Sequence, residues 1–109
     1  MKSVRILPLA IRELRAAYRW YESERLGLGA EFMKSVHSTL ETVRTHPTAS
    51  TLLGTHTRRV LVARFPYVVL FTVEADQVLV VAIQHMHRDP RAWADRVHDR
   101  ASSPVFAQV

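Results

Sequence analysis

The sequence lacks cysteine, has only three glycines among its 109 residues, and contains no long apolar run. The absence of cysteine excludes disulfide bonds, thiolate metal sites and thiol nucleophiles, and it fits the reducing cytoplasm. Scarce glycine together with 48% hydrophobic residues excludes a disordered composition and indicates one globular domain with a single core. No apolar run approaches the roughly 20 residues needed to cross a bilayer, so we expect no membrane segment.

Lysine is also scarce, since 13 of the 15 basic residues are arginine. The formal net charge is +5. The planar guanidinium suits phosphate and carboxylate groups, so we predict an acidic partner, either a nucleic acid or an acidic protein. A basic surface without a specific ligand is the alternative. Arg5 and Pro8 interrupt the N-terminal segment, which therefore lacks the apolar region of a secretory signal, and we expect a cytoplasmic protein.

Two valine-rich runs, residues 67–73 and 78–85, flank a short polar segment. Their composition and length predict two neighbouring strands, and Ala75-Asp76 predicts a two-residue hairpin turn between them. Both faces of this hairpin are apolar. One face needs the helices described below, and the other needs a cover from the C-terminal segment or from a partner protein.

The turn also predicts a register for the hairpin. It places Val73 opposite Val78, Phe71 opposite Val80 and Val69 opposite Ala82. The opposite face of the hairpin would then carry Val68, Leu70, Leu79, Val81 and Ile83.

The N-terminal half predicts a strand followed by two helices. Residues 3–7 read as a short strand, and residues 9–25 as an amphipathic helix with apolar residues at spacings of three and four. Leu26-Gly27-Leu28-Gly29 breaks that helix, and a second helix is predicted over residues 30–45 until His46-Pro47 ends it. Arginines at positions 12, 15 and 19 line the first helix, and a solvated face is favoured over a binding face for them.

The C-terminal half predicts a three-stranded meander. Residues 48–57 read as a polar loop and residues 58–63 as the first strand before the hairpin. Asp89-Pro90 can start a short helix that continues through Trp93, Arg96 and Val97.

The predicted fold is therefore α+β with the order β-α-α-β-β-β and a short final helix. The helical hairpin packs on one face of a small, mostly antiparallel, four-stranded sheet. We expect a single domain over residues 1–100 and a flexible tail over residues 101–109.

This order of elements, together with a set of short motifs along the chain, resembles the RelE/ParE superfamily of toxins from type II toxin–antitoxin systems. The resemblance covers about residues 4–97. The matching pieces are Trp20-Tyr21-Glu22, Leu28-Gly29 with Glu31-Phe32, Val43 with His46-Pro47, Arg59, Phe65-Pro66-Tyr67-Val68-Val69, Val81-Ala82-Ile83-Gln84-His85, Arg88-Asp89-Pro90, Trp93 and Arg96. The set is most similar to the ParE, or plasmid-stabilisation, branch.

The resemblance implies a small toxin that a cognate antitoxin holds inactive. ParE-like members poison DNA gyrase and have no established hydrolytic chemistry, whereas RelE-like members are ribosome-dependent mRNA endonucleases. A degenerate homologue that binds antitoxin without being toxic is a further alternative. We expect the antitoxin to be acidic and partly disordered, and to form a hetero-oligomer by folding over the helical hairpin and the exposed sheet surface.

Cleavage of mRNA needs a base near the ribose 2′-OH, cations on the phosphate and an acid at the leaving oxygen. The RelE-like pattern has a basic residue where this sequence has Val68, and it has another near Leu61, which is also apolar here. Arg59, His85 and Arg88 remain as candidate catalytic residues. This depletion favours the ParE-like function over the ribonuclease.

Several basic and aromatic residues are candidates for binding the target or the antitoxin, with solvated strand ends as the alternative for the arginines. They are Arg58, Arg59, Arg64, His87, Arg88, Trp93 and Arg96, the last of which also reads as a structural tie between the final helix and the sheet. Phe65, Tyr67, Trp20 and Tyr21 could stack on bases, but core packing is favoured. His85 and His87 lack a third ligand, so we predict no metal site and no cofactor.

Overall fold

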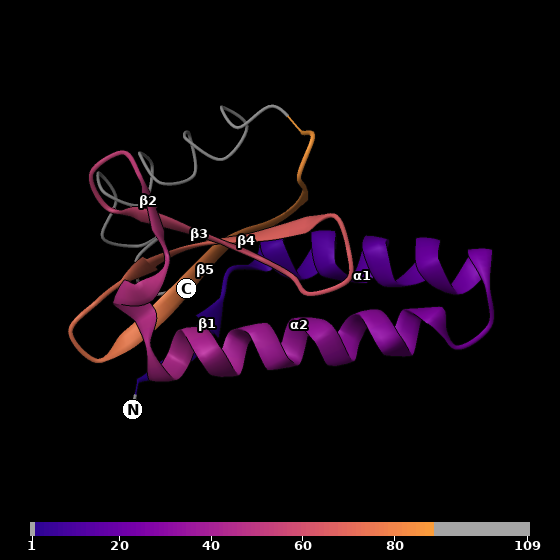
Figure 1. Cartoon of the computed structure of the whole chain (residues 1–109), viewed down its shortest axis with the longest axis horizontal. Helices are drawn as coiled ribbons and strands as arrows, with labels where there is room; N and C mark the ends of the chain where they lie inside the picture. The colour runs from indigo at the N-terminus through magenta and orange to yellow at the C-terminus, as the bar shows by residue number, and fades with distance from the viewer. Residues whose placement is uncertain (1, 89–109) are drawn as a thin grey trace.

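A computed structural model describes residues 2–88 of the chain and places two helices against one twisted sheet (Figure 1). The α+β class expected from the sequence is confirmed. The predicted helix at positions 89–97 and the predicted tail at 101–109 lie outside the described residues. In chain order the elements are β1 (Ser3–Ile6), α1 (Pro8–Glu24), α2 (Leu28–Thr45), the 3-10 helix η1 (Pro47–Ala49), β2 (Thr51–Leu53), β3 (Thr57–Leu61), β4 (Tyr67–Val73) and β5 (Gln77–His85).

The sheet of the described chain has five strands in the order β1-β5-β4-β3-β2, not the four expected. β1 runs parallel to β5, and the other neighbours are antiparallel. The additional strand β2 lies in the segment predicted to be a polar loop. Arg58 stabilises that segment, since its guanidinium donates to the carbonyls of Thr48 and Ser50 at 3.1 and 2.6 Å. A polar segment therefore forms an edge strand because its neighbour holds it there.

The predicted register of the hairpin is correct at its turn and wrong beyond it. Val73 pairs with Val78 and Phe71 with Val80 as expected, but Val69 pairs with Ile83 instead of Ala82. The register shifts between Leu70 and Phe71, where β5 contains one extra residue. Such a bulge exchanges the faces of every later residue on its strand, because side chains alternate along a strand.

This bulge decides which strand residues face the helices. Ile83, predicted to lie on the opposite face, packs in the cluster beneath the helices, and Ala82 lies on the opposite face. The cluster beneath the helices contains Leu14, Tyr21, Phe32, Val36, Val43, Phe65, Val69, Phe71, Val78, Val80 and Ile83 among others. The opposite face carries a smaller cluster of Leu7, Val68, Leu70, Leu79, Val81 and Ala82.

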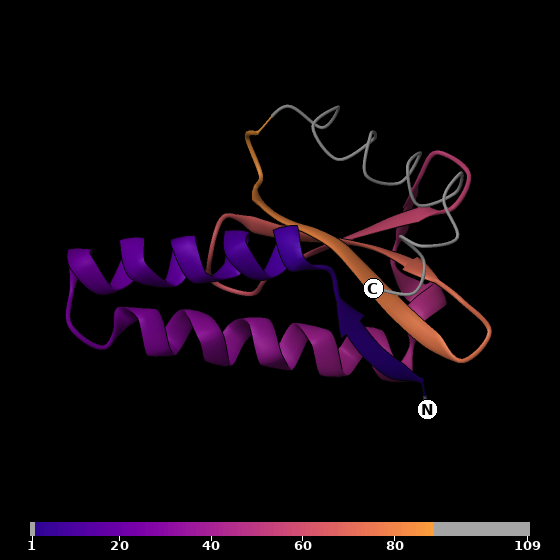
Figure 2. The same ribbon diagram turned by 180° about the vertical axis from the view of Figure 1, so that it is seen from behind.

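The helices form the antiparallel hairpin expected from the glycine turn, and the hairpin extends past the end of the sheet (Figure 2). Gly27 adopts φ 90°, a left-handed conformation that glycine permits at low cost. Gly29, predicted to belong to the turn, instead lies inside α2. A Cβ on Gly29 would come within 2.8 Å of Glu22 Oε1 and 2.9 Å of the Tyr18 ring, so glycine lets the two helices approach.

The carboxylate of Glu22 at the end of α1 holds the start of α2. Its two oxygens accept hydrogen bonds from the backbone N–H groups of Gly27 and Gly29, both at 2.9 Å. These are N–H groups that a helix start leaves without an intrahelical partner, and a negative charge there also complements the helix dipole. None of the described helices is long and apolar enough to cross a membrane.

Candidate functional site

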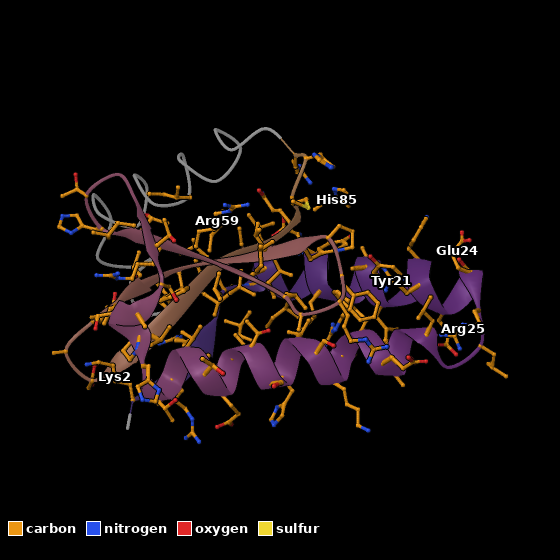
Figure 3. All side chains as sticks on the ribbon, in the orientation of Figure 1. Lys2, Tyr21, Glu24, Arg25, Arg59 and His85 are labelled. Atoms are coloured by element: carbon orange, nitrogen blue, oxygen red, sulfur yellow. The ribbon has the colours of Figure 1, made fainter. Side chains whose placement is uncertain are left out.

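The candidate site lies on the face of the sheet that the helices leave uncovered, where β3, β4 and β5 lie side by side. Leu70 of β4 pairs with Arg59 of β3, and Val68 pairs with Gln84 of β5. These residues share one face, because paired residues of antiparallel strands point to the same side. Figure 3 shows Arg59 on the side of the sheet away from α2. His85 pairs with Tyr67 at the end of β5, and its ring lies 5.5 Å from the Tyr67 ring, at the edge between the two faces.

A concavity of about 220 Å³ occupies this surface. Its apolar part comes from Leu53, Val68, Leu70 and Met86, and its polar part from Arg59, Gln84, His85 and Arg88. The structure therefore brings together all three residues that the sequence analysis named as catalytic candidates. Arg59 forms no ion pair with any residue in the described part of the chain, so its guanidinium is available to an anionic ligand.

Val68, where the RelE-like pattern has a cation, and Leu61, near which it has another, are neighbours on this same surface. Leu61 of β3 pairs directly with Val68 of β4, two residues along the strand from Arg59. Leu61 is 52% exposed, and Val68 is buried. Val68, which lines the concavity, and Leu61 beside it therefore form an apolar surface where a phosphate clamp would need positive charge. Losing a single such contact typically costs a factor of about 100 to 1,000 in rate.

His85 is held in one tautomer by its neighbour. The backbone N–H of His87 donates to His85 Nδ1 at 3.2 Å. A backbone N–H can only donate, so Nδ1 is the acceptor, and neutral His85 carries its proton on Nε2. In this neutral form Nε2–H is a hydrogen-bond donor, and Nε2 is not free to act as the base that ribose activation needs.

The other candidate binding residues lie in different surroundings. Arg58 is half-buried by its bonds to the loop carbonyls, and Arg64 donates to Glu31 of α2 at 2.9 Å. Arg64 itself adopts φ 72° and lies 5.9 Å from the centre of the Phe65 ring. The ring of His87 lies 5.3 Å from that of His85, whereas Trp93 and Arg96 lie outside the described residues.

Glu31 joins two of these arginines. Its carboxylate accepts from Arg25 at 3.0 Å and from Arg64 at 2.9 Å, linking the tip of the helical hairpin to the β3–β4 turn. The hydrogen bonds from Arg64 and then Arg25 lower the pKa of Glu31 below its usual value. Arg64 is thus partly neutralised within the chain, unlike Arg59.

Three of the four aromatic residues weighed as a stacking platform belong to the core. Tyr21 and Phe65 are buried with ring centres 4.9 Å apart, and Tyr67 packs against both Phe32 and Tyr21. Burial raises the pKa of both Tyr21 and Tyr67, so neither supplies a phenolate base near neutral pH. Trp20 differs, since it is 58% exposed and borders a second hollow with Tyr67 and His85.

Sequence reasoning missed the polar residues that position β5. Glu13 of α1 accepts a hydrogen bond from the Ile83 N–H at 3.0 Å and one from the Gln84 amide at 3.4 Å. β1 pairs with β5 only as far as Val80. Beyond that point the carboxylate of Glu13 takes the place of β1 as a hydrogen-bond partner of β5. A glutamine inside an apolar strand was the only signal in the sequence. No cluster of three metal-ligating side chains occurs within residues 2–88.

Comparisons with known proteins identify the family from the sequence and the fold from the structure. A model of the family described as the ParE toxin of the type II toxin–antitoxin system parDE matches residues 4–90. A solved structure described as the chromosomal ParDE system from P. aeruginosa has a TM-score of 0.68 and 15% sequence identity, covering 78% of this chain and 96% of that one. No curated protein sequence matches the chain.

Proposed function

Since this chain belongs to the ParE toxin family of type II toxin–antitoxin systems, we propose that it acts in the cytoplasm as a toxin that poisons DNA gyrase and that a cognate antitoxin neutralises. The observation that carries the gyrase target is the apolar pair of Leu61 and Val68 beside Arg59. A site that lacks cations at two adjacent positions is poorly equipped to stabilise a cleaving phosphate. Binding to a protein target does not require cations at these two positions.

A supercoiling assay tests this proposal. Purified chain at micromolar concentration should inhibit DNA gyrase and leave gyrase-linked breaks in the plasmid. In cells, expression without antitoxin should arrest growth with filaments and a DNA-damage response. Full gyrase activity and intact plasmid in the presence of the folded chain would contradict the proposal.

A ribosome-dependent ribonuclease is the second candidate, because Arg59, His85 and Arg88 line a single concavity. In this alternative the two arginines bind the phosphate, and His85 donates a proton to the leaving oxygen once its ring has become an imidazolium and Nδ1 has released the His87 N–H. Primer extension on translated mRNA after induction would reveal site-specific cuts. Arrest of translation without a damage response would favour this function over the first.

One substitution separates the two candidates. His85→Gln removes the proton donor, so it should abolish mRNA cleavage but leave gyrase inhibition intact. His56→Gln is the matched control, because it also removes an exposed imidazole, at the β2–β3 turn away from the site. Unchanged growth when the wild-type chain is expressed would contradict both candidates. The chain would then be a degenerate family member whose function is to bind antitoxin.

For the antitoxin we propose an acidic, partly disordered segment that forms a hetero-oligomer with this chain. The net charge of +5 and the exposed apolar residues Trp20 and Leu61 support a partner that brings both carboxylates and apolar side chains. Co-expression from both neighbouring genes should yield a stable complex. A stable monomer that does not co-purify with the product of the neighbouring gene would overturn this.

A further inference from the structure

Helix α1 carries a basic stripe, defined as Arg12, Arg15 and Arg19, on the side away from the core. All three side chains are exposed, whereas Ala10, Leu14, Ala17 and Tyr21 of the same helix are buried. The spacings of three and four residues place the arginines in one line, because neighbours on a helix surface lie three or four residues apart. The stripe is separate from the concavity around Arg59.

The stripe carries its full charge. None of its arginines has an ion pair or side-chain hydrogen bond to any residue from 2 to 88. Of the positions three or four residues from them, only Glu22 is acidic, and its two oxygens are taken by the N–H groups of Gly27 and Gly29. The carboxylate of Glu13 is likewise turned to β5.

This arrangement is unfavourable for the isolated helix. Arg12 and Arg15 stand three residues apart, and Arg15 and Arg19 stand four apart, and like charges at these spacings destabilise a helix. An ordinary solvated helix face mixes the two signs of charge. An anionic ligand laid along the stripe would relieve this repulsion.

The spacing and surroundings of the stripe fit a nucleic-acid backbone. Seven residues of helix span about 10.5 Å, and one strand of duplex DNA carries a phosphate every 3.4 Å or so along its axis, which gives about three phosphates for three arginines. The small residues Ala16 and Ser23 lie on the same line of the helix, so no bulky side chain keeps a phosphate strand away. Exposed Leu9 and Tyr18 flank the line at 44% and 38% exposure, so it is the spacing of the charges that favours a phosphate backbone over an acidic peptide.

We propose that the basic stripe of α1 binds the phosphate backbone of duplex DNA without regard to sequence. The guanidinium groups bind phosphates directly and release the counterions that the phosphates had held. This contact would bring the chain to DNA whatever protein it targets there, and it does not depend on whether gyrase is that target.

Fluorescence anisotropy with a labelled 20-base-pair duplex tests the proposal across a series of NaCl concentrations, with the full chain made by cell-free synthesis. The wild-type chain should bind with an affinity that falls as salt rises. The triple variant R12Q/R15Q/R19Q should reduce the slope of log Kobs against log salt by about 2.7, which is 0.9 for each lost phosphate contact. Circular dichroism should show the variant to be as helical as the wild type or more so.

A charge-matched control removes three arginines that are ion-paired in the structure. R25Q/R44Q/R64Q also lowers the net charge by three, but these guanidinium groups already pair with Glu31 or Glu41. It should leave the slope unchanged. An equal loss of slope in the control would show a dependence on net charge alone and would overturn the proposal.

Three other results would also overturn it. The triple variant could keep the wild-type slope, the slope could disappear in R59Q/R88Q instead, or a labelled polyglutamate peptide could bind as tightly as DNA and be lost in the triple variant. The last result would identify an acidic protein as the ligand of the stripe. Gyrase inhibition measured on the same variants would separate failure of this proposal from failure of the proposed function.

Discussion

The two faces of the sheet use similar strand residues for different purposes. The face beneath the helices is closed by the chain itself, and Phe32 and Phe71 are completely buried there. On the other face, buried Val68 and Leu70 lie beside exposed Leu61 and the cation Arg59, which has no ion-pair partner among residues 2–88. The first face therefore provides most of the stability, and the second presents side chains to a ligand. Apolar composition alone does not distinguish the two roles.

The comparison predicts its largest effect at Phe71. Phe71→Ala should lower the free energy of unfolding by about 3 to 5 kcal/mol, because it leaves a cavity under both helices. Urea denaturation followed by circular dichroism measures the change. Leu61→Ala on the other face is the control and should change stability by less than about 1 kcal/mol. Equal losses in the two variants would contradict the assignment of stability to the helix face.

Glu13 lies at the boundary between the faces and should have an intermediate effect. Glu13→Ala leaves the Ile83 N–H and the Gln84 amide without their carboxylate partner, at a cost of about 1 to 3 kcal/mol. In this variant the backbone amide of Ile83 should exchange its hydrogen faster than the amide of Val80, because β1 still pairs with β5 at Val80. Unchanged exchange at Ile83 would mean that Glu13 does not protect the strand edge.

Alkaline pH should weaken the helix face specifically. Burial raises the pKa of Tyr21 and Tyr67 above 10.0, so these phenols favour folding while they stay protonated. Their contribution is fully present below pH 10 and is lost as the pH rises through the folded-state pKa values. Unfolding free energies measured between pH 8 and 12 should show this decline, and Tyr67→Phe should make it shallower.

The smallest effect on stability should accompany a change on the open face. Leu61→Arg replaces an exposed side chain and should alter the unfolding free energy by no more than about 0.5 kcal/mol. It also restores a cation beside Arg59. If the concavity binds RNA phosphates, single-stranded RNA should bind the variant more tightly than the wild type in a filter-binding assay, and an unchanged affinity would argue against that function.

Much of the fold follows from the sequence because it depends on local patterns. Helical spacing, the proline at the start of α1, the glycine turn and the polar hairpin turn all predict their elements within a few residues. Arg59, His85 and Arg88 were named as candidates from the resemblance to the RelE-like pattern. Their meeting in one concavity depends on the pairing of β3, β4 and β5, which brings residues distant in the chain together.

Other features were decided by tertiary structure alone. The bulge in β5 exchanged Ala82 and Ile83 between the faces, and no local pattern marks an extra residue inside a continuous apolar run. The strand β2 exists because β3 pairs with it and Arg58 holds the preceding segment. The carboxylate of Glu13 finds its partners 70 and 71 residues away.

The sequence by itself determined the family, the order of the described elements other than η1 and β2, and the basic composition, because these reside in residue types and their spacing along the chain. The tertiary structure decided which charges remain available. Glu22 and Glu31 look equivalent to the arginines around them in the sequence, yet Glu22 binds backbone N–H groups and Glu31 neutralises Arg25 and Arg64. Arg59 and the α1 stripe stay unpaired among the described residues because the available carboxylates are directed elsewhere.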